Sequence, residues 1–181
     1  MATATELPIN TSATALEMAD EIFGTGMVVN SATYSGGAAS SGSYFNGDTV
    51  SPFAAPGDTG IILSTGNAVD FTNSDGTARI NQSGGTSTNP VGGIDGDLDF
   101  NALATVSVGD GMASISNINN GETQNIFNDK LADQFNTEMD GFTLTHTFTA
   151  PITPGAINTL KFGVTDVGDS GYDTNLLVAG G

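Results

Sequence analysis

The first periodic stretch of the chain has helical spacing. Between Asn10 and Gly24, apolar residues recur three or four positions apart, which places them on one face of a helix. These residues are Ala15, Leu16, Ala19, Ile22 and Phe23. Asn10, Thr11 and Ser12 are candidate N-caps, and Gly24 suits the left-handed residue that ends a helix. The pattern therefore predicts one N-terminal helix over about residues 12–23, and we expect it to cover one face or end of a sheet.

The pattern then changes to short apolar runs and to alternation, both of which are typical of strands. The predicted strands are 27–34, 60–64, 113–118, 142–149, 159–167 and 176–178. In the clearest of them, 142–149, four threonines share one face. Its other face carries Phe142, Leu144, His146 and Phe148. In 159–167 the alternation predicts that Leu160, Phe162 and Val164 point inward.

Turn dipeptides such as Asn46-Gly47 and Asp140-Gly141 separate these strands. Two long stretches, residues 35–58 and 71–93, are rich in Gly, Ser, Thr and Asn, so we expect extended surface loops there. A chain of 181 residues has the size of one domain, and no repeat of fixed period is visible. We therefore predict a single domain, 1–181, that is mainly β. Its expected architecture is an antiparallel β-sandwich, jelly-roll-like, with one N-terminal α-helix.

The charge of the chain restricts its partners. Twenty Asp and Glu stand against three Lys and Arg, which gives a formal net charge of −17. Such a chain repels phosphate, so we expect no nucleic-acid partner, and no apolar run approaches the length of a membrane span. There is no Cys, which suits an exported bacterial protein braced by metal ions instead of disulfides. Residues 1–5 lack the features of a secretory signal, so the export route stays open.

Acidic residues gather at turns in three places, where carboxylates repel one another unless a cation lies between them. Hard oxygen ligands on flexible turns suit Ca²⁺, whereas the alternative is that the acids only keep the chain soluble. The residues that we predict as metal ligands are Asp95, Asp97 and Asp99, then Glu138 and Asp140, and finally Asp166, Asp169, Asp173 and Asn175.

The last of these clusters carries the strongest metal signal. Three carboxylates and one amide lie within residues 166–175, directly after a predicted strand. Gly168 and Gly171 let the backbone curl there, although solvated Asx turns are the alternative interpretation. The first cluster has the odd-position spacing of half an EF-hand loop, but it lacks the Gly and Glu that complete one. We therefore expect calcium, bound without an EF-hand.

Catalytic motifs are sparse. His146 is the only histidine and there is no Cys, which excludes Cys–His catalysis and zinc sites with several histidines. No Gly-x-Ser-x-Gly elbow is present, so a Ser–His–Asp triad has no support beyond composition. His146 lies on the apolar face of a predicted strand, where a packing role is expected. We predict that the protein is not an enzyme.

Five motifs together resemble a known family. In order, they cover residues 6–11, 60–66, 96–104, 136–142 and 166–173. This series resembles the bacterial choice-of-anchor L domain, which occurs in secreted and surface proteins with varied C-terminal anchoring devices. The resemblance implies an extracellular, β-rich module with an adhesive or structural role.

The chain departs from that family at one point. Around Ser107–Val108 a central block of the family, with several strands, is missing. A sheet opened in this way would offer unpaired edges, which a strand from another copy could fill. Residues 2–9 are a candidate donor, limited by Pro8. A homopolymeric fibre assembled by strand donation is therefore one alternative function.

The sequence therefore predicts an extracellular or cell-surface structural or adhesion module, stabilised by Ca²⁺. Its expected partner is a surface or matrix polymer, or another copy of itself. A carbohydrate-binding module is a further alternative, which aromatic residues along a groove would favour. There is no Trp, and the only tyrosines are Tyr34, Tyr44 and Tyr172.

Overall fold

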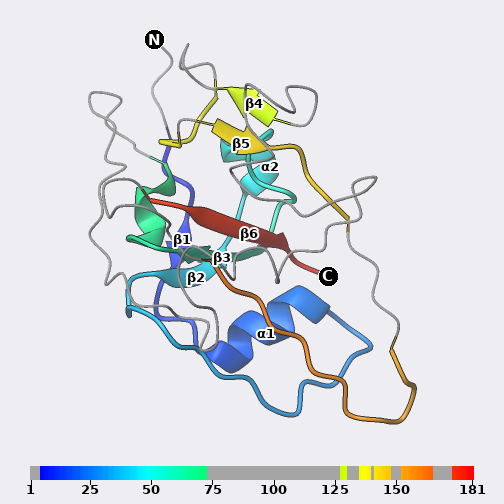
Figure 1. The fold of residues 1–181 in the computed structure, drawn as a ribbon. Coiled ribbons are helices and arrows are strands. Elements are labelled where there is room, and N and C mark those ends of the chain that lie inside the picture. Colours follow the sequence, from blue (N-terminus) through cyan, green and yellow to red (C-terminus); the bar gives the residue numbers. More distant parts are fainter. Residues whose placement is uncertain (1–4, 73–126, 130–134, 140, 148–151, 165–172) are drawn as a thin grey trace, which may run out of the picture.

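The computed structural model describes the residues that form its sheet and several flanking segments (Figure 1). These are residues 5–72, 127–129, 135–139, 141–147, 152–164 and 173–181. The predicted strand 113–118 and nearly all of the predicted loop 71–93 lie outside them. So do six predicted metal ligands: Asp95, Asp97, Asp99, Asp140, Asp166 and Asp169.

The N-terminal helix α1 (Ala15–Phe23) begins later than predicted, because Thr14 is its N-cap rather than residues 10–12. The Thr14 side chain accepts a hydrogen bond from the Glu17 amide at 3.2 Å, and the Glu17 carboxylate accepts one from the Thr14 amide at 2.7 Å. This reciprocal pair is a capping box. Gly24 ends the helix at φ 58°, as predicted, in a conformation that glycine adopts without strain.

The buried face of α1 differs in detail from the predicted one. Met18 is buried, whereas Leu16 is exposed. Met18 lies three residues after Ala15 and four before Ile22, so it belongs to the same stripe at helical spacing. The helix contacts β2 (Ser41–Tyr44) and β3 (Gly60–Ser64), and Figure 1 shows it along one side of their sheet. The expectation that it covers part of a sheet is confirmed.

The main sheet is antiparallel and has the order β1-β2-β3-β6. Its outer strands are β1 (Ile9–Asn10) and β6 (Asn175–Ala179), and Figure 1 shows β6 crossing the middle of the molecule. The predicted strands 60–64 and 176–178 are confirmed as β3 and β6, which pair along their whole length. A second pair joins β4 (Phe127–Asp129) to β5 (Gly141–Thr143). The described part of the chain is thus mainly β, and a sandwich of jelly-roll type stays a prediction.

The prediction of a surface loop over 35–58 is wrong. This stretch contains β2, whose residues are all buried, and the short helix α2 (Gly47–Val50). The reason is packing of small residues: a Cβ on Gly42 would lie 2.7 Å from the Asn10 carbonyl oxygen, so only glycine lets β1 approach. Strand β2 reads Ser-Gly-Ser-Tyr, and no apolar alternation announces it.

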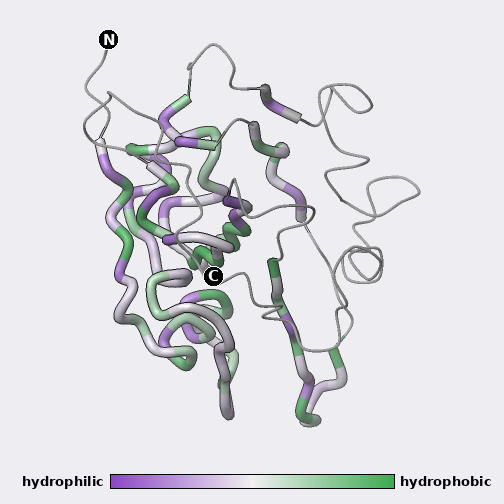
Figure 2. Tube along the Cα trace, turned by 60° about the vertical axis from the view of Figure 1, so that its left-hand side comes forward, coloured by the Kyte–Doolittle hydropathy of each residue, from purple (hydrophilic) through white to green (hydrophobic). Residues whose placement is uncertain are grey.

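Several strand predictions are wrong as well. Residues 27–34 and 159–164 form no strand, and β5 covers only the first two residues of 142–149 before residues 144–147 leave it. Leu160 and Phe162 are exposed rather than inward, and only Val164 is buried as expected. Figure 2 shows the stretch 152–164 standing away from the sheet, with apolar positions along it. Alternation without a partner strand is not enough to make a strand.

The candidate donor segment, residues 2–9, lies partly in the core of its own chain. Leu7 is buried, and Ile9 pairs with Tyr44 at the edge of the same sheet. Nearby, the 3₁₀ helix η1 (Ala68–Phe71) contributes to the core, so residues 71 and 72 are buried rather than looped out. The core residues are Leu7, Tyr44, Ala55, Ile62, Ala68, Phe71 and Met139.

Candidate functional site

Two of the sequence motifs, 6–11 and 136–142, meet at one side of the core. The Leu7 amide donates to Thr72 Oγ1 at 2.8 Å, which joins the N-terminal motif to the end of η1. The Thr137 hydroxyl donates to the Phe71 carbonyl at 2.9 Å, and the Glu138 amide donates to the same oxygen at 2.8 Å. Segments far apart in the chain are therefore held together by buried hydrogen bonds.

Asn136 strengthens this junction. Its Nδ2 donates to the Thr5 carbonyl at 2.9 Å and to the Val50 carbonyl at 2.8 Å. Its own carbonyl accepts a hydrogen bond from Ser51 Oγ at 2.6 Å. One residue thus links the N-terminal segment, the end of α2 and the segment 135–139.

The predicted ligand Asp173 lies where β3 and β6 meet. Beyond the last strand pair, the Thr65 amide donates to the Thr174 carbonyl at 3.0 Å, and the Thr174 amide donates to Thr65 Oγ1 at 2.9 Å. These bonds set the Asp173 carboxylate directly against Gly66, where a Cβ would overlap it. Asp173 is only 7% exposed. Gly66 therefore acts as the floor of a small carboxylate pocket.

Asn175 lies beside this pocket. It lies two residues after Asp173 and is the first residue of β6. Its Nδ2 donates to the Met139 sulfur at 2.9 Å, and its Oδ1 is buried and has no hydrogen-bond partner. The contact with Met139 also brings the segment of a third predicted ligand, Glu138, to this strand.

The pocket offers the right kind of atoms for a hard cation, since Asp173 supplies a buried carboxylate and Asn175 a buried amide oxygen. Ca²⁺ takes about six to eight oxygen ligands, more than Asp173 and Asn175 supply. Asp166 and Asp169 belong to the same run of sequence and lie outside the described residues. Within the residues that the structure describes, no three His, Asp or Glu side chains are close enough together to hold a metal ion.

His146 follows β5 and is half-buried. Its Nε2 is buried and has no hydrogen-bond partner in the structure.

Tyr44 places a polar hydroxyl inside the core, which the sequence pattern does not indicate. The side chain is fully buried against Gly60, its partner across the strands, and its hydroxyl has no hydrogen-bond partner. Burial raises the pKa of this hydroxyl well above its ordinary value. Three carboxylates raise the pKa further, those of Asp48, Glu21 and Asp58. Tyr44 is a core residue, so it cannot form part of a sugar-binding surface.

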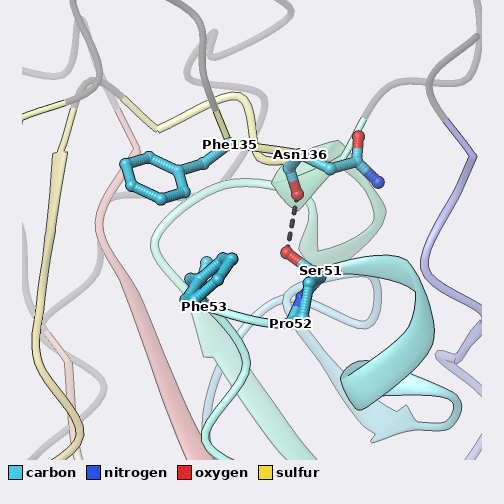
Figure 3. Close-up of a pocket in the computed structure, with 6 residues that line it drawn as sticks. Ser51, Pro52, Phe53, Phe135 and Asn136 are labelled. Atoms are coloured by element: carbon cyan, nitrogen blue, oxygen red, sulfur yellow. Dashed lines mark hydrogen bonds between the residues drawn. The ribbon is translucent and has the colours of Figure 1, made fainter. Parts of the chain in front are cut away.

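Three phenylalanine rings, those of Phe53, Phe135 and Phe142, form an aromatic row. The Phe53 and Phe135 rings are 5.7 Å apart and meet edge to face, and the Phe135 and Phe142 rings are 4.9 Å apart in a similar arrangement. Phe53 is 68% exposed. Figure 3 shows its ring below that of Phe135, beside a hollow of about 210 Å³. The lining residues are Ser51, Pro52, Phe53, Ala54, Phe135 and Asn136, and we call this feature the Phe53–Phe135 hollow.

The polar groups of this hollow are already engaged. Ser51 Oγ donates to the Asn136 carbonyl, and Figure 3 shows the Asn136 amide pointing away from the two rings. The sequence analysis above weighs only Trp and Tyr as aromatic platforms, so it does not predict this hollow. The one sequence feature that points to it is the abundance of phenylalanine, with ten in the chain.

Comparison with known proteins adds no relative to this description. Across the part of the chain that the structure describes, no helix has the length and apolar character needed to cross a membrane. No family model, curated protein or solved structure matches the chain, so its resemblance to the choice-of-anchor L domain stays a prediction.

Proposed function

We propose that this chain is an extracellular structural or adhesion module of a bacterial surface or matrix protein, and that Ca²⁺ supports its fold. One observation carries the calcium part of the proposal. The buried Oδ1 of Asn175 has no hydrogen-bond partner, and the buried residue Asp173 lies two positions before it in the chain. Burying such an oxygen without a partner is costly, and a bound cation removes that cost.

The position of the site explains why calcium would act on stability. Asp173 and Asn175 lie at the start of β6, opposite Gly66 and Ser64 at the end of β3. Asn175 also contacts Met139, a core residue from a distant part of the chain. A cation held there would tie β6 and the segment 135–139 to the centre of the sheet, since both supply groups next to it. Its role would be structural, as expected of a module that has no catalytic constellation.

The proposal is tested by thermal melting in millimolar Ca²⁺ and in EDTA. At a hundredfold excess over the dissociation constant, binding to the folded state alone adds about 2.7 kcal/mol of stability. We expect a rise of several degrees with Ca²⁺ in the wild type and in the control Asp20→Asn, whose carboxylate is exposed on α1. Asp173→Asn should lose most of that rise. Identical melting curves in Ca²⁺ and EDTA for the wild type would refute the calcium proposal.

The aromatic row gives the carbohydrate-binding alternative partial support. Phe53, Phe135 and Phe142 supply stacking surfaces, which such modules use. Sugar hydroxyls also need polar partners, and those of the hollow are already hydrogen-bonded to the protein. This chemistry favours an apolar group over a sugar.

The fibre alternative meets a different difficulty. The segment proposed as the donor strand contributes Leu7 to the core of its own chain and Ile9 to its own sheet. Donation to another copy would therefore require exchange of a strand that is already in place. Strand donation remains a prediction that these contacts do not favour.

A further inference from the structure

The Phe53–Phe135 hollow is framed by a turn that is held from both sides. After α2, the Ser51 carbonyl accepts hydrogen bonds from the Ala54 amide at 3.1 Å and the Ala55 amide at 2.9 Å. The Ser51 hydroxyl reaches across to the Asn136 carbonyl, and Ser51 itself is buried. The turn therefore presents Phe53 in a defined position before any partner arrives, which lowers the cost of ordering on binding.

Phe53 is an unusual side chain to leave in water. Its ring is 68% exposed, while one edge contacts Phe135, which in turn packs against Phe142. The aromatic row therefore has a supported inner end and a free outer end beside the hollow. An exposed aromatic ring of this kind, held next to a hollow whose Ser51 hydroxyl and Asn136 Nδ2 are already hydrogen-bonded, is suited to an apolar or cationic group.

Charge decides between those partners. The whole chain has only three Lys and Arg against twenty acids. This net charge attracts cations and repels anions. A second copy of this chain carries the same net charge of −17 and is repelled as well.

We infer that the Phe53–Phe135 hollow binds an arginine-bearing apolar segment of a partner protein, with the guanidinium stacked on the Phe53 ring. Arginine fits better than lysine because its planar group stacks on aromatic faces and is more weakly hydrated. The apolar stem fills the hollow, and the positive charge is attracted by the net negative charge of the chain. The inference rests on the proposed adhesion role and specifies its partner; it does not depend on calcium.

The test measures binding of short labelled peptides to the whole chain at physiological salt. One peptide alternates Leu and Arg, a second alternates Leu and Glu, and a third alternates Gly and Arg. We expect the Leu–Arg peptide to bind the wild type, and Phe53→Ala to weaken that binding about tenfold or more, equal to about 1.4 kcal/mol. The matched control is Phe162→Ala, an exposed ring in the stretch 152–164, which should bind like the wild type. Phe53→Trp should retain binding, because Trp is the best partner for a cation.

Several results would overturn the inference. Equal affinity of the Phe53→Ala and Phe162→Ala variants for the Leu–Arg peptide would show that charge alone attracts it. Equal loss of Gly–Arg and Leu–Arg binding in Phe53→Ala would show that the apolar residues of the peptide contribute nothing. Preference for the Leu–Glu peptide would show that the hollow does not select a cation. Phe53-dependent binding of a malto-oligosaccharide without Leu–Arg binding would assign the hollow to sugars. The calcium proposal is measured by melting and this one by affinity, so failure of either is recognised separately.

Discussion

Strand β2 and the stretch 152–164 show how little hydrophobicity alone decides in this molecule. Strand β2 consists of two serines, a glycine and a tyrosine, yet every one of its residues is buried between β1 and β3. The stretch 152–164 carries Ile152, Ile157, Leu160 and Phe162, yet all four are exposed. The difference lies in partners: β2 is hydrogen-bonded on both sides, whereas 152–164 contains no described strand.

Both regions nevertheless have ordered local structure. In 152–164, Asn158 closes a turn: its Oδ1 accepts from the Thr153 amide at 3.0 Å, and its Nδ2 donates to the Thr153 and Ala156 carbonyls. Gly155 adopts φ 75° at the tip, which glycine permits. Local hydrogen bonds thus shape a turn, but burial of apolar side chains requires a second surface to pack against.

The largest expected effect contrasts two isoleucines. Ile62 is completely buried in β3, so Ile62→Ala should lower the free energy of unfolding by about 2 to 5 kcal/mol through lost burial and a cavity. Ile157→Ala, in the exposed stretch, should change it by less than about 0.5 kcal/mol. Urea unfolding followed by circular dichroism measures both. Similar losses in the two variants would mean that Ile157 is packed, and the comparison would fail.

A smaller effect is expected from a buried hydroxyl. Thr72 Oγ1 accepts the Leu7 amide at 2.8 Å, so Thr72→Val should leave that buried amide without a partner at a cost of about 1 to 3 kcal/mol. The same substitution at Thr159, which is exposed in 152–164, is the matched control and should be nearly neutral. Urea unfolding of both variants is the measurement. A neutral Thr72→Val would show that the N-terminal motif is not held by this bond.

The smallest effect concerns the cap of α1. Thr14→Ala should cost about 1 kcal/mol, while Thr25→Ala, exposed beyond the helix end, serves as control.

The backbone and side chain of Thr14 donate to the Glu17 carboxylate and lower its pKa. Because the pKa of Glu17 is lower in the folded state, its ionised carboxylate stabilises the fold at pH values above the unfolded-state pKa, near 4.3. This stabilisation is lost as the pH falls through the folded-state pKa.

This pH dependence can be measured by comparing the wild type with Glu17→Ala. The stability difference between them should be present at neutral pH and should shrink as the pH falls below about 4. A difference that stays constant with pH would show that the Glu17 carboxylate is not engaged in the capping box.

Some elements of the fold can be predicted from the sequence because their signals are local. The run Gly60–Ser64 and the apolar residues of β6 are short hydrophobic segments bounded by turn residues, and both are strands. Gly24 ends α1 because the left-handed conformation there depends only on the residue itself. The predicted start of the helix is too early, because several consecutive residues are good N-caps. Among them, only Thr14 has a Glu three positions later to complete a capping box.

The candidate site divides in the same way. The spacing of the acidic run predicts Asp173 and Asn175 as ligands, and the structure buries Asp173 and the Oδ1 of Asn175. The contact of Asn175 with Met139 joins residues that are remote in sequence, so no local pattern could indicate it. The same holds for Phe53 and Phe135, which become neighbours only through the bond between Ser51 and Asn136.

The sequence alone thus determines the acidic character through its composition. It also determines the main apolar strands, the helix and its C-terminal glycine, because these depend on neighbouring residues. The tertiary structure decided that a serine-rich strand is central, that an apolar stretch is exposed, and that Asp173 lies on Gly66. Those outcomes depend on which distant segments pair. Pairing is settled by the fit of whole surfaces, such as the glycine contacts that admit β1 beside β2, rather than by the hydrophobicity of any one segment.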